Sequence, residues 1–354
     1  MVNGAGGAVS TEAKPITGIK FVFLLAIESS CDDTSVAILQ DGIPLSNVVS
    51  SQMVHENYGG VVPEMASREH QKNIVNVAQM ALAQANVSKS QIDAIAFTQG
   101  PGLLGSLMVG TSFAKGLSIG LNKPLIAVNH MEAHILSLLI DEPKPSFPFI
   151  CLVVSGGHTM IVLVRDWNRM EILGGTKDDA VGEAFDKCAK LLGLGYPGGK
   201  QIDDLAKTGN PNAFKFPVGQ MPGYHFSYSG VKTSFLYFLR EKGEGFASNN
   251  LNDICASLQF ALLKPLLEKT ALAMDEFSIQ NLGMSGGVAA NSALRSSLKD
   301  LSIKHNWNLY IPDFQYCTDN AAMIGRAAMF KWELQDFCGL NVSTEPRLKI
   351  GEVV

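Results

Sequence analysis

Several common signatures are missing from this chain of 354 residues. Its six cysteines include no C-x-x-C pair, which argues against a zinc ribbon or a thioredoxin-type site. In a chain of this length, so few cysteines also argue against a disulfide framework and favour a reducing compartment. No uninterrupted apolar run reaches the roughly 18 residues that a membrane span needs. We therefore predict a cytoplasmic protein that makes no contact with a membrane.

A basic excess is also missing. Lys and Arg number 28 against 33 Asp and Glu, which gives a formal charge of −5 and argues weakly against a stand-alone nucleic-acid binder. Apolar residues make up 46% of the chain, enough for a sizeable core, so the bulk of the chain is not disordered. Residues 1–20, rich in Gly, Ala, Ser and Thr, are predicted to form a disordered tail.

Two blocks of predicted elements flank a proline-rich hinge at residues 141–148, where three prolines exclude a helix or a central strand. Each block reads as a meander of three strands followed by alternating helices and strands. Such tandem units indicate an α/β fold of two similar, ribonuclease-H-like lobes with the ligand in a cleft between them. The predicted division is 21–145 for lobe I, 148–319 for lobe II, and 320–345 as a C-terminal helix that packs back on lobe I.

The predicted elements follow from apolar periodicity and turn residues. In the first block the expected strands are 21–27, 35–39, 47–52, 92–97 and 125–128, and the expected helices begin near 63, 102 and 130. In the second block the expected strands are 149–154, 159–164, 171–174, 281–284 and 308–311, and the expected helices are 181–192, 201–208, 252–274, 291–301 and 319–334.

Three turns rich in Gly, Ser and Asp follow predicted strands: Glu28–Thr34, Val154–Thr159 and Met284–Asn291. Glycine lets backbone N–H groups approach phosphate oxygens, and a helix N-terminus favours an anion. Any one of these turns is also explained as a tight hairpin. Because the first two occupy equivalent positions in the two blocks, together they favour nucleotide binding.

His130 and His134 stand at i and i+4, a spacing that places both imidazoles on one helix face and suits a metal ion. Asp319 offers a third ligand. The alternative is structural: His130 as a helix cap, His134 packed, and Asp319 as an N-cap. A zincin protease is poorly supported because its general base directly follows the first His, whereas here Met131 does so and the acid is Glu132.

For the other polar groups, both a ligand-binding role and a structural role stay open. Asp186 and Asp203 can bind ribose hydroxyls or belong to solvated helix faces and caps. His158 can contact a phosphate or be structural. The aromatic, hydroxyl-rich stretch 224–233 is interpreted as a loop that seals the second lobe, with base stacking as the alternative.

Taken together, these motifs resemble the TsaD family of tRNA threonylcarbamoyladenosine synthesis proteins, also catalogued as O-sialoglycoprotein endopeptidase-like. The resemblance covers residues 24–346 and rests on nine stretches in order along the chain: AIESSCDDTSVAI, HENYGGVVPEMASREH, TQGPGLLGSLMVG, NHMEAH, LVVSGGHT, DDAVGEAFDKCAKLLGLGYPGG, FSYSGVKT, MSGGVAAN and YCTDNAAMIG. The forms ESSCDDT and SGGHT resemble the bacterial or organellar branch rather than the archaeal and eukaryotic cytosolic one.

The resemblance implies an actin-, Hsp70- and sugar-kinase-like (ASKHA) fold. It implies an acyltransferase that moves the threonylcarbamoyl group from threonylcarbamoyl-AMP to N6 of adenosine 37, next to the anticodon, of tRNAs that read codons starting with A. It implies one divalent metal ion, Fe²⁺ by preference or Zn²⁺, held by His130, His134 and Asp319, and ATP, ADP or threonylcarbamoyl-AMP in the cleft. The nucleotide-binding positions that match are Val153, Val154, Ser155, Gly156, Gly157, Asp186, Gly199, Asp203 and Asn291. The implied partners are TsaB and TsaE, with a TsaC/Sua-type synthase upstream.

Asp32 and Asp33 are the candidate catalytic residues, since either carboxylate can orient the adenosine amine or accept its proton. Three other classes stay open at this point. A kinase or ATPase of the same fold needs no His pair, a metalloprotease needs a base beside its metal, and a nucleotide-dependent scaffold transfers nothing. The charge of −5 predicts that partner subunits or a local basic rim bring the tRNA to the enzyme.

Overall fold

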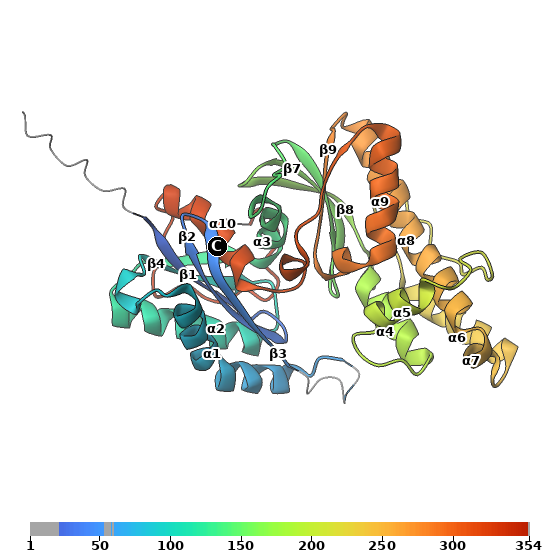
Figure 1. Ribbon diagram of the computed structural model, residues 1–354, viewed down its shortest axis with the longest axis horizontal. Coiled ribbons are helices and arrows are strands. Elements are labelled where there is room, and N and C mark those ends of the chain that lie inside the picture. Colours follow the sequence, from blue (N-terminus) through green and yellow to red (C-terminus); the bar gives the residue numbers. More distant parts are fainter. Residues whose placement is uncertain (1–20, 53–57, 59, 353–354) are drawn as a thin grey trace, which may run out of the picture.

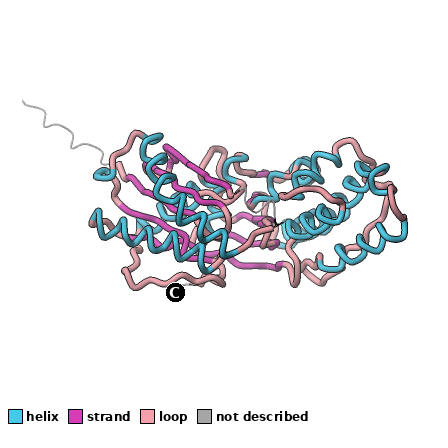
Figure 2. The backbone as a smooth tube through the Cα atoms, turned by 90° about the horizontal axis from the view of Figure 1, so that it is seen from below, coloured by secondary structure: helices cyan, strands magenta, loops and turns pink. Residues whose placement is uncertain are grey.

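A computed structural model describes residues 21–52, 58 and 60–352 of the chain. The predicted tail at 1–20 and part of the HENYGG stretch lie outside the described residues. The described part contains two five-stranded sheets, which lie side by side along the long axis of the molecule (Figures 1 and 2). The first sheet has the order β3-β2-β1-β4-β5, and the second has the order β10-β9-β6-β7-β8.

The two sheets share one topology. In each, three strands form an antiparallel meander and two further strands add in parallel. The strands of the first sheet are β1 (Phe23–Glu28), β2 (Asp33–Gln40), β3 (Ile43–Ser51), β4 (Ala94–Gly100) and β5 (Leu125–Asn129). Those of the second are β6 (Phe149–Val154), β7 (Thr159–Asp166), β8 (Arg169–Gly175), β9 (Asn281–Ser285) and β10 (Asn308–Tyr310). The predicted α/β fold class is confirmed.

Helices cover both faces of the first sheet. On one face, α1 (Pro63–Ala85) and α2 (Leu104–Leu121) enclose a core that includes Ile27, Ile74 and Phe97. On the other face, α3 (His130–Leu136) and α10 (Ala321–Glu333) pack against Ala26, Leu39 and neighbouring residues. Helix α10 therefore crosses back to the first sheet after the chain has completed the second.

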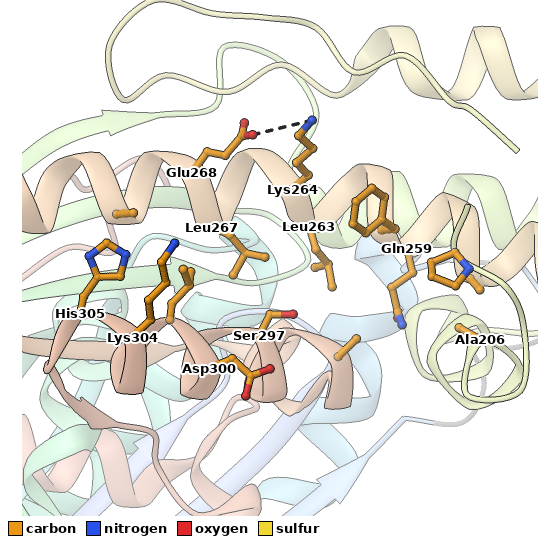
Figure 3. Close-up of a pocket in the computed structure, with 16 residues that line it drawn as sticks. Ala206, Gln259, Leu263, Lys264, Leu267, Glu268, Ser297, Asp300, Lys304 and His305 are labelled. Carbon is orange, nitrogen blue, oxygen red and sulfur yellow. Dashed lines mark ion pairs between the residues drawn. The ribbon is translucent and has the colours of Figure 1, made fainter. Parts of the chain in front are cut away.

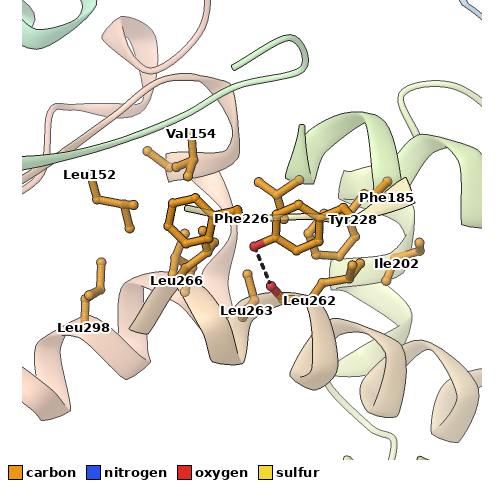
Figure 4. Packing of buried hydrophobic residues seen from close by; sticks show 14 of the residues in the cluster. Leu152, Val154, Phe185, Ile202, Phe226, Tyr228, Leu262, Leu263, Leu266 and Leu298 are labelled. Atoms are coloured by element: carbon orange, nitrogen blue, oxygen red, sulfur yellow. Dashed lines mark hydrogen bonds between the residues drawn. The ribbon is translucent and has the colours of Figure 1, made fainter. Parts of the chain in front are cut away.

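The second sheet buries one face under α4 (Val181–Leu191), α5 (Gly198–Ala206), α6 (Ser229–Lys242) and α8 (Leu251–Glu276). The core between them is apolar and aromatic, and the buried Tyr228 hydroxyl donates a hydrogen bond to the Leu262 carbonyl (Figure 4). Helix α9 (Ser292–His305) packs on the same core through Leu294 and Leu298, and a short helix, α7 (Phe246–Asn249), precedes α8. We call each sheet with its helices the first and the second lobe; the exact residue boundaries predicted above stay a prediction.

Helix α3 belongs to both lobes. Its Ala133 and Leu136 pack in the core of the first lobe, whereas Met131 and Ile135 pack against Phe149 and neighbouring strand residues of the second sheet. A short helix buried on two sides has fixed side-chain directions. The polar residues of α3 are therefore held where the two lobes meet.

One region differs from the sequence prediction. The stretch predicted as an aromatic loop becomes helical at Ser229, where α6 begins, and α7 was not predicted at all. The start of α6 is fixed by a distant residue, because the Asp178 carboxylate accepts hydrogen bonds from the backbone N–H groups of Tyr228 and Ser229. A local pattern cannot show such a contact.

By length and composition alone, one helix of the described chain, Leu104–Leu121, could cross a membrane. In the structure it packs against α1 and β4, and the ammonium of its Lys115 donates a hydrogen bond to the Val342 carbonyl at 2.6 Å. All six cysteines lie within the described residues, and none forms a disulfide.

Candidate functional site

The His pair predicted from the sequence meets Asp319 at the junction of the lobes. His130 Nε2 lies 3.5 Å and His134 Nε2 lies 3.1 Å from the same Asp319 Oδ1. Both imidazoles come from α3, and Asp319 comes from the segment that returns from the second lobe to α10. The three side chains thus offer two nitrogens and one oxygen within 4.8 Å of one another.

These residues fit a divalent metal ion of the zinc or iron type. Ligands at about 2.0–2.2 Å from a tetrahedral ion lie about 3.3–3.6 Å apart, close to the separations found here. Two imidazoles and a carboxylate are a donor set that both Zn²⁺ and Fe²⁺ accept. His134 Nδ1 is buried and has no hydrogen-bond partner within the described part of the chain. Nε2 is therefore the nitrogen through which His134 contacts Asp319.

The structural alternative for these residues is wrong in its main points. Helix α3 is capped by Asn129, whose side chain accepts from the N–H groups of Met131 and Glu132. Helix α10 is capped by Asn320, whose side chain accepts from the Met323 N–H. His130 and Asp319 therefore cap nothing, and both side chains turn toward the junction of the lobes instead.

The pKa values of His130 and Asp319 are strongly perturbed. Burial alone would lower the pKa of His130, but the carboxylates of Glu28 and Asp319 raise it to about 10. Burial would raise the pKa of Asp319, but His130 and His134 hold it well below its usual range. A metal ion has to displace the protons that these interactions favour, so metal binding must weaken as the pH falls.

Glu132 points away from this cluster. Its carboxylate accepts a hydrogen bond from the Gly351 N–H at 2.8 Å, near the end of the described chain. It is therefore not placed as the general base of a metalloprotease, in agreement with its position on the helix.

Ser285 is not placed as a nucleophile. Residues 283–287 fit the G-x-S-x-G spacing of a nucleophile elbow, but Ser285 is fully buried and its Oγ lies against Cys151 Sγ at 3.6 Å. A nucleophilic serine needs an exposed hydroxyl beside a base.

The glycine turn after β6 leaves its backbone accessible. Ser155 and His158 close the turn with two hydrogen bonds between themselves, while Gly156 and Gly157 are exposed. A Cβ added at either glycine would meet nothing within 4 Å. Helix α4 begins beside this turn, where its Gly182 is so close to the Ser155 carbonyl that a Cβ would lie 2.6 Å from that oxygen. The turn and a helix N-terminus thus form one surface that favours an anion.

The turn after β9 lies against the first one. Gly286 has a φ of +91°, and a Cβ there would lie 2.4 Å from the Val154 carbonyl oxygen. Asn291 follows as the N-cap of α9, accepting from the Leu294 N–H and donating to Gln259 Oε1 at 2.7 Å. Val153 and Val154, which also match the family positions, are buried in β6 and support the turns.

The predicted ribose ligands already have protein partners. Asp186 Oδ1 accepts from the N–H groups of Gly198 (2.8 Å) and Gly199 (3.3 Å), which fixes the start of α5. Asp203 accepts from the N–H and the hydroxyl of Ser292 in α9. Each carboxylate therefore joins two elements of the second lobe. Burial raises the pKa of Asp186, and hydrogen bonds from Gly198 and Gly199 oppose that rise.

Asp32 and Asp33 lie on the hairpin of the first lobe. Burial, opposed by a Ser51 hydrogen bond and reinforced by the charges of Asp319, Asp32 and Glu28, raises the pKa of Asp33 to about 7. Asp32 interacts electrostatically with Asp186 and with Tyr196 of the second lobe. The acidic hairpin thus lies near Asp186 and Tyr196 of the second lobe, across the junction.

Two polar groups of this junction were missed or left open by the sequence. Glu28 is the last residue of β1, is fully buried and contacts His130, although the sequence places it only in the polar turn Glu28–Thr34. His158 lies close enough to the cluster that burial, followed by His130 and His134, lowers its pKa to about 4. A neutral His158 therefore stands beside the cluster at neutral pH.

A hollow of about 690 Å³ lies elsewhere, between α8 and α9 (Figure 3). Its floor is formed by apolar residues such as Leu263 and Leu267, and the Lys264–Glu268 ion pair lies at its rim. It contains none of the candidate catalytic or metal-ligating residues. We therefore do not assign the chemistry to it.

Comparison with known proteins gives a consistent result. Residues 44–326 match the family described as TsaD: tRNA N6-adenosine threonylcarbamoyltransferase. A curated protein of that name from Cytophaga hutchinsonii is 54% identical over 93% of this chain and 97% of its own length. One from Christiangramia forsetii is also 54% identical, over 92% of this chain and 98% of its own length.

Solved structures support the fold. Full-length HypF in its phosphate- and nucleotide-bound form aligns with a TM-score of 0.61 at 14% identity, over 89% of this chain and 47% of that protein. Component A of (R)-2-hydroxyglutaryl-CoA dehydratase from Acidaminococcus fermentans aligns with a TM-score of 0.54 at 14% identity, over 89% and 99% of the two chains. Both neighbours have the ASKHA-type fold expected from the sequence.

Proposed function

The chain belongs to the TsaD family of tRNA N6-adenosine threonylcarbamoyltransferases, and from this premise we propose how its residues carry out the transfer. It is an acyltransferase that acts on an adenosine of tRNA. The observation that carries the proposal is the meeting of His130, His134 and Asp319 with the acidic hairpin and the glycine turns at the junction of the lobes.

His130, His134 and Asp319 are the residues that hold a divalent ion, Fe²⁺ by preference or Zn²⁺. When bound, the ion supplies Lewis-acid polarisation and a template for oxygen atoms of the substrate. The donor set and its spacing support this assignment, and Glu28 supports it by contacting His130 from the side opposite Asp319.

The second lobe binds the nucleotide part of threonylcarbamoyl-AMP, with ATP or ADP as alternative occupants. The backbone N–H groups of Ser155–Gly157 donate to phosphate oxygens or to the oxyanion that develops during transfer. Asp186, Gly199, Asp203 and Asn291 surround the nucleoside, with Val153 and Val154 behind the turn. Because Asp186 and Asp203 already accept hydrogen bonds from the protein, they contribute chiefly by fixing the starts of α5 and α9 around the ligand.

In the transfer step the N6 amine of adenosine 37 attacks the carbamoyl carbon. The bond from that carbon to the phosphate oxygen breaks, and AMP leaves with the electron pair. The amine loses one proton, which Asp33 accepts while Asp32 orients the amine. A carboxyl group with a pKa near 7 suits this task because it is substantially ionised at neutral pH and still basic enough to accept a proton.

The partners we propose are tRNA, TsaB and TsaE, with a TsaC/Sua-type synthase supplying threonylcarbamoyl-AMP. The negative net charge supports delivery of tRNA by partner subunits or by a local basic rim. A cytoplasmic location stays a prediction.

The test is reconstitution from purified components. The metal-loaded chain is incubated with threonylcarbamoyl-AMP and unmodified tRNA, with and without TsaB and TsaE, and the tRNA nucleosides are then analysed. We expect threonylcarbamoyladenosine to form, and we expect His134→Ala to lose both the metal and the product. Full transfer by His134→Ala with a normal metal content would contradict the metal role.

A further inference from the structure

Glu28 is a buried carboxylate at the junction of the lobes, and the proposed mechanism uses only the fact that it contacts His130. It ends β1, and its side chain is 0% exposed. Its Oε1 accepts a hydrogen bond from the Ser30 N–H, and its Oε2 accepts one from the Thr98 hydroxyl at 2.6 Å. The same Oε2 lies 3.0 Å from His130 Nδ1. A carboxylate so deeply buried has to be paired. Among these partners, His130 is the one side chain that can carry a positive charge.

The two ring nitrogens of His130 face opposite directions. Nδ1 faces Glu28, and Nε2 faces Asp319 Oδ1 at 3.5 Å. An imidazole that binds a metal through one nitrogen carries its proton on the other, and an acceptor at the second nitrogen fixes which is which. A carboxylate beside Nδ1 places the proton there and leaves the lone pair of Nε2 directed at the proposed metal position.

We propose that Glu28 is a positioning residue that holds His130 in its Nδ1–H form, so that Nε2 binds the metal ion. The inference rests on the proposed metal role of His130, His134 and Asp319. The arrangement is asymmetric, because His134 Nδ1 has no hydrogen-bond partner in the described chain. Of the two histidines, both of which contact Asp319 through Nε2, His130 is the one whose Nδ1 also contacts a carboxylate in the described chain.

Glu28 is itself held in place by the first sheet. Thr98 is a residue of β4, the strand that pairs with β1, and the Ser30 N–H belongs to the turn after β1. The orientation of His130 is therefore set by the strands of the first lobe. A weaker competitor for the same role is Ser30, whose hydroxyl lies 3.3 Å from His130 Nδ1. Ser30 is uncharged and the contact is longer, so it should hold the proton less firmly.

Glu28→Gln separates these possibilities because an amide cannot satisfy both sides of the carboxylate. If its oxygen faces His130, its NH₂ group opposes the Ser30 N–H. If its NH₂ group faces His130, it favours a bare Nδ1 and a protonated Nε2, which cannot bind a metal. Either orientation should weaken the metal site without changing its ligands.

The experiment measures the Zn²⁺ dissociation constant of the full chain by competition with a chromogenic chelator. We expect Glu28→Gln to raise that constant about 10- to 100-fold, the usual effect of losing such an outer contact. Thr98→Val is the matched control, since it removes another hydrogen bond of the same carboxylate but leaves His130 in contact. Thr98→Val and Ser30→Ala should each raise the dissociation constant less than about threefold, which is clearly below the effect expected for Glu28→Gln.

A second readout follows the proton itself. In ¹⁵N-histidine spectra of the Zn²⁺-loaded protein, His130 of the wild type should show a protonated Nδ1, and Glu28→Gln should shift or lose that signal. Glu28→Asp keeps the charge but shortens the side chain, so it serves if Glu28→Gln does not fold, and it should weaken Zn²⁺ binding to an intermediate degree.

Wild-type Zn²⁺ affinity in folded Glu28→Gln would overturn the proposal. So would equal losses in Glu28→Gln and Thr98→Val, which would indicate a merely structural role, or wild-type affinity in Glu28→Asp when Glu28→Gln is unfolded. His130→Ala tests the premise separately. If His130→Ala binds Zn²⁺ normally, the proposed metal site is wrong, whatever the Glu28 variants do.

Discussion

The hairpins β1–β2 and β6–β7 occupy equivalent positions in two sheets of one topology, yet they are built for different tasks. The first is anchored from outside: the Cys31 carbonyl accepts from His70 Nε2 of α1 at 2.9 Å and from the Ser106 hydroxyl of α2 at 3.1 Å. In the described residues, the tip of the second is closed by hydrogen bonds between Ser155 and His158, and α4 contacts the hairpin at its base, where the Val181 N–H donates to the Thr159 hydroxyl.

The side chains differ accordingly. The first hairpin presents acidic groups, whose position matters to within a fraction of an ångström, and α1 and α2 hold it there. The second presents exposed glycine N–H groups, whose use requires that nothing cover them. The comparison indicates that two hairpins of one topology differ in what they offer a ligand. The first positions acidic side chains, and the second presents backbone N–H groups.

Asp33→Asn should have the largest effect on transfer. It keeps the shape of the side chain but removes the proton acceptor, so the single-turnover rate should fall about 10²- to 10⁴-fold. Metal content and nucleotide affinity should stay near those of the wild type. Asp32→Asn is the matched control on the same hairpin and should lose less. If the two variants lose equally, the hairpin acts through its total charge rather than through one base.

The pH dependence should follow the same residue. Because the pKa of Asp33 is raised to about 7, the carboxyl is protonated below that pH and cannot accept the amine proton. At saturating metal, the rate should fall about tenfold per pH unit below 7 and level off above it. In Asp33→Asn this limb should disappear. The raised pKa also means that ionised Asp33 disfavours folding above pH 7, and that this cost is relieved as the pH falls.

The sequence predicts that two similar hairpins exist, but it does not show the contacts that make them different. The tandem meanders, the His pair and the glycine turns are local patterns, and they predicted the fold and the positions of the turns. The contacts that distinguish the hairpins are not local: His70 is 39 residues from Cys31, and Glu28 is 102 residues from His130. The start of α6 was missed for the same reason, since Asp178 reaches it from a distant turn.

Gly156→Ala tests the open hairpin. A Cβ at this position meets no protein atom within 4 Å, so the free energy of unfolding should change by less than about 1 kcal/mol. The methyl group should obstruct the approach of a phosphate, which would weaken AMP or threonylcarbamoyl-AMP binding about 10- to 100-fold, the worth of a hydrogen bond to a charged group. Calorimetric titration and urea unfolding measure the two effects.

The matched control is Gly182→Ala. There a Cβ would lie 2.6 Å from the Ser155 carbonyl oxygen, so stability should fall as well as affinity. Unchanged nucleotide affinity in Gly156→Ala would show that the turn does not carry the phosphate.

His70→Ala tests the anchored hairpin, with the smallest effect on transfer. His70 is fully buried, and its ring contacts the Cys31 carbonyl and the Thr34 hydroxyl at 2.9 and 2.7 Å. Its removal leaves the Thr34 hydroxyl without this partner and the Cys31 carbonyl with the Ser106 contact, so urea unfolding should show a loss of about 1–3 kcal/mol. Because the carboxylates stay in place most of the time, transfer should fall only severalfold, and nucleotide affinity should not change.

Ser106→Ala is the milder counterpart, since the Cys31 carbonyl then keeps the His70 contact. A loss of stability without any loss of transfer would mean that the hairpin does not need its anchors for chemistry, and the contrast between the two hairpins would then be one of packing alone.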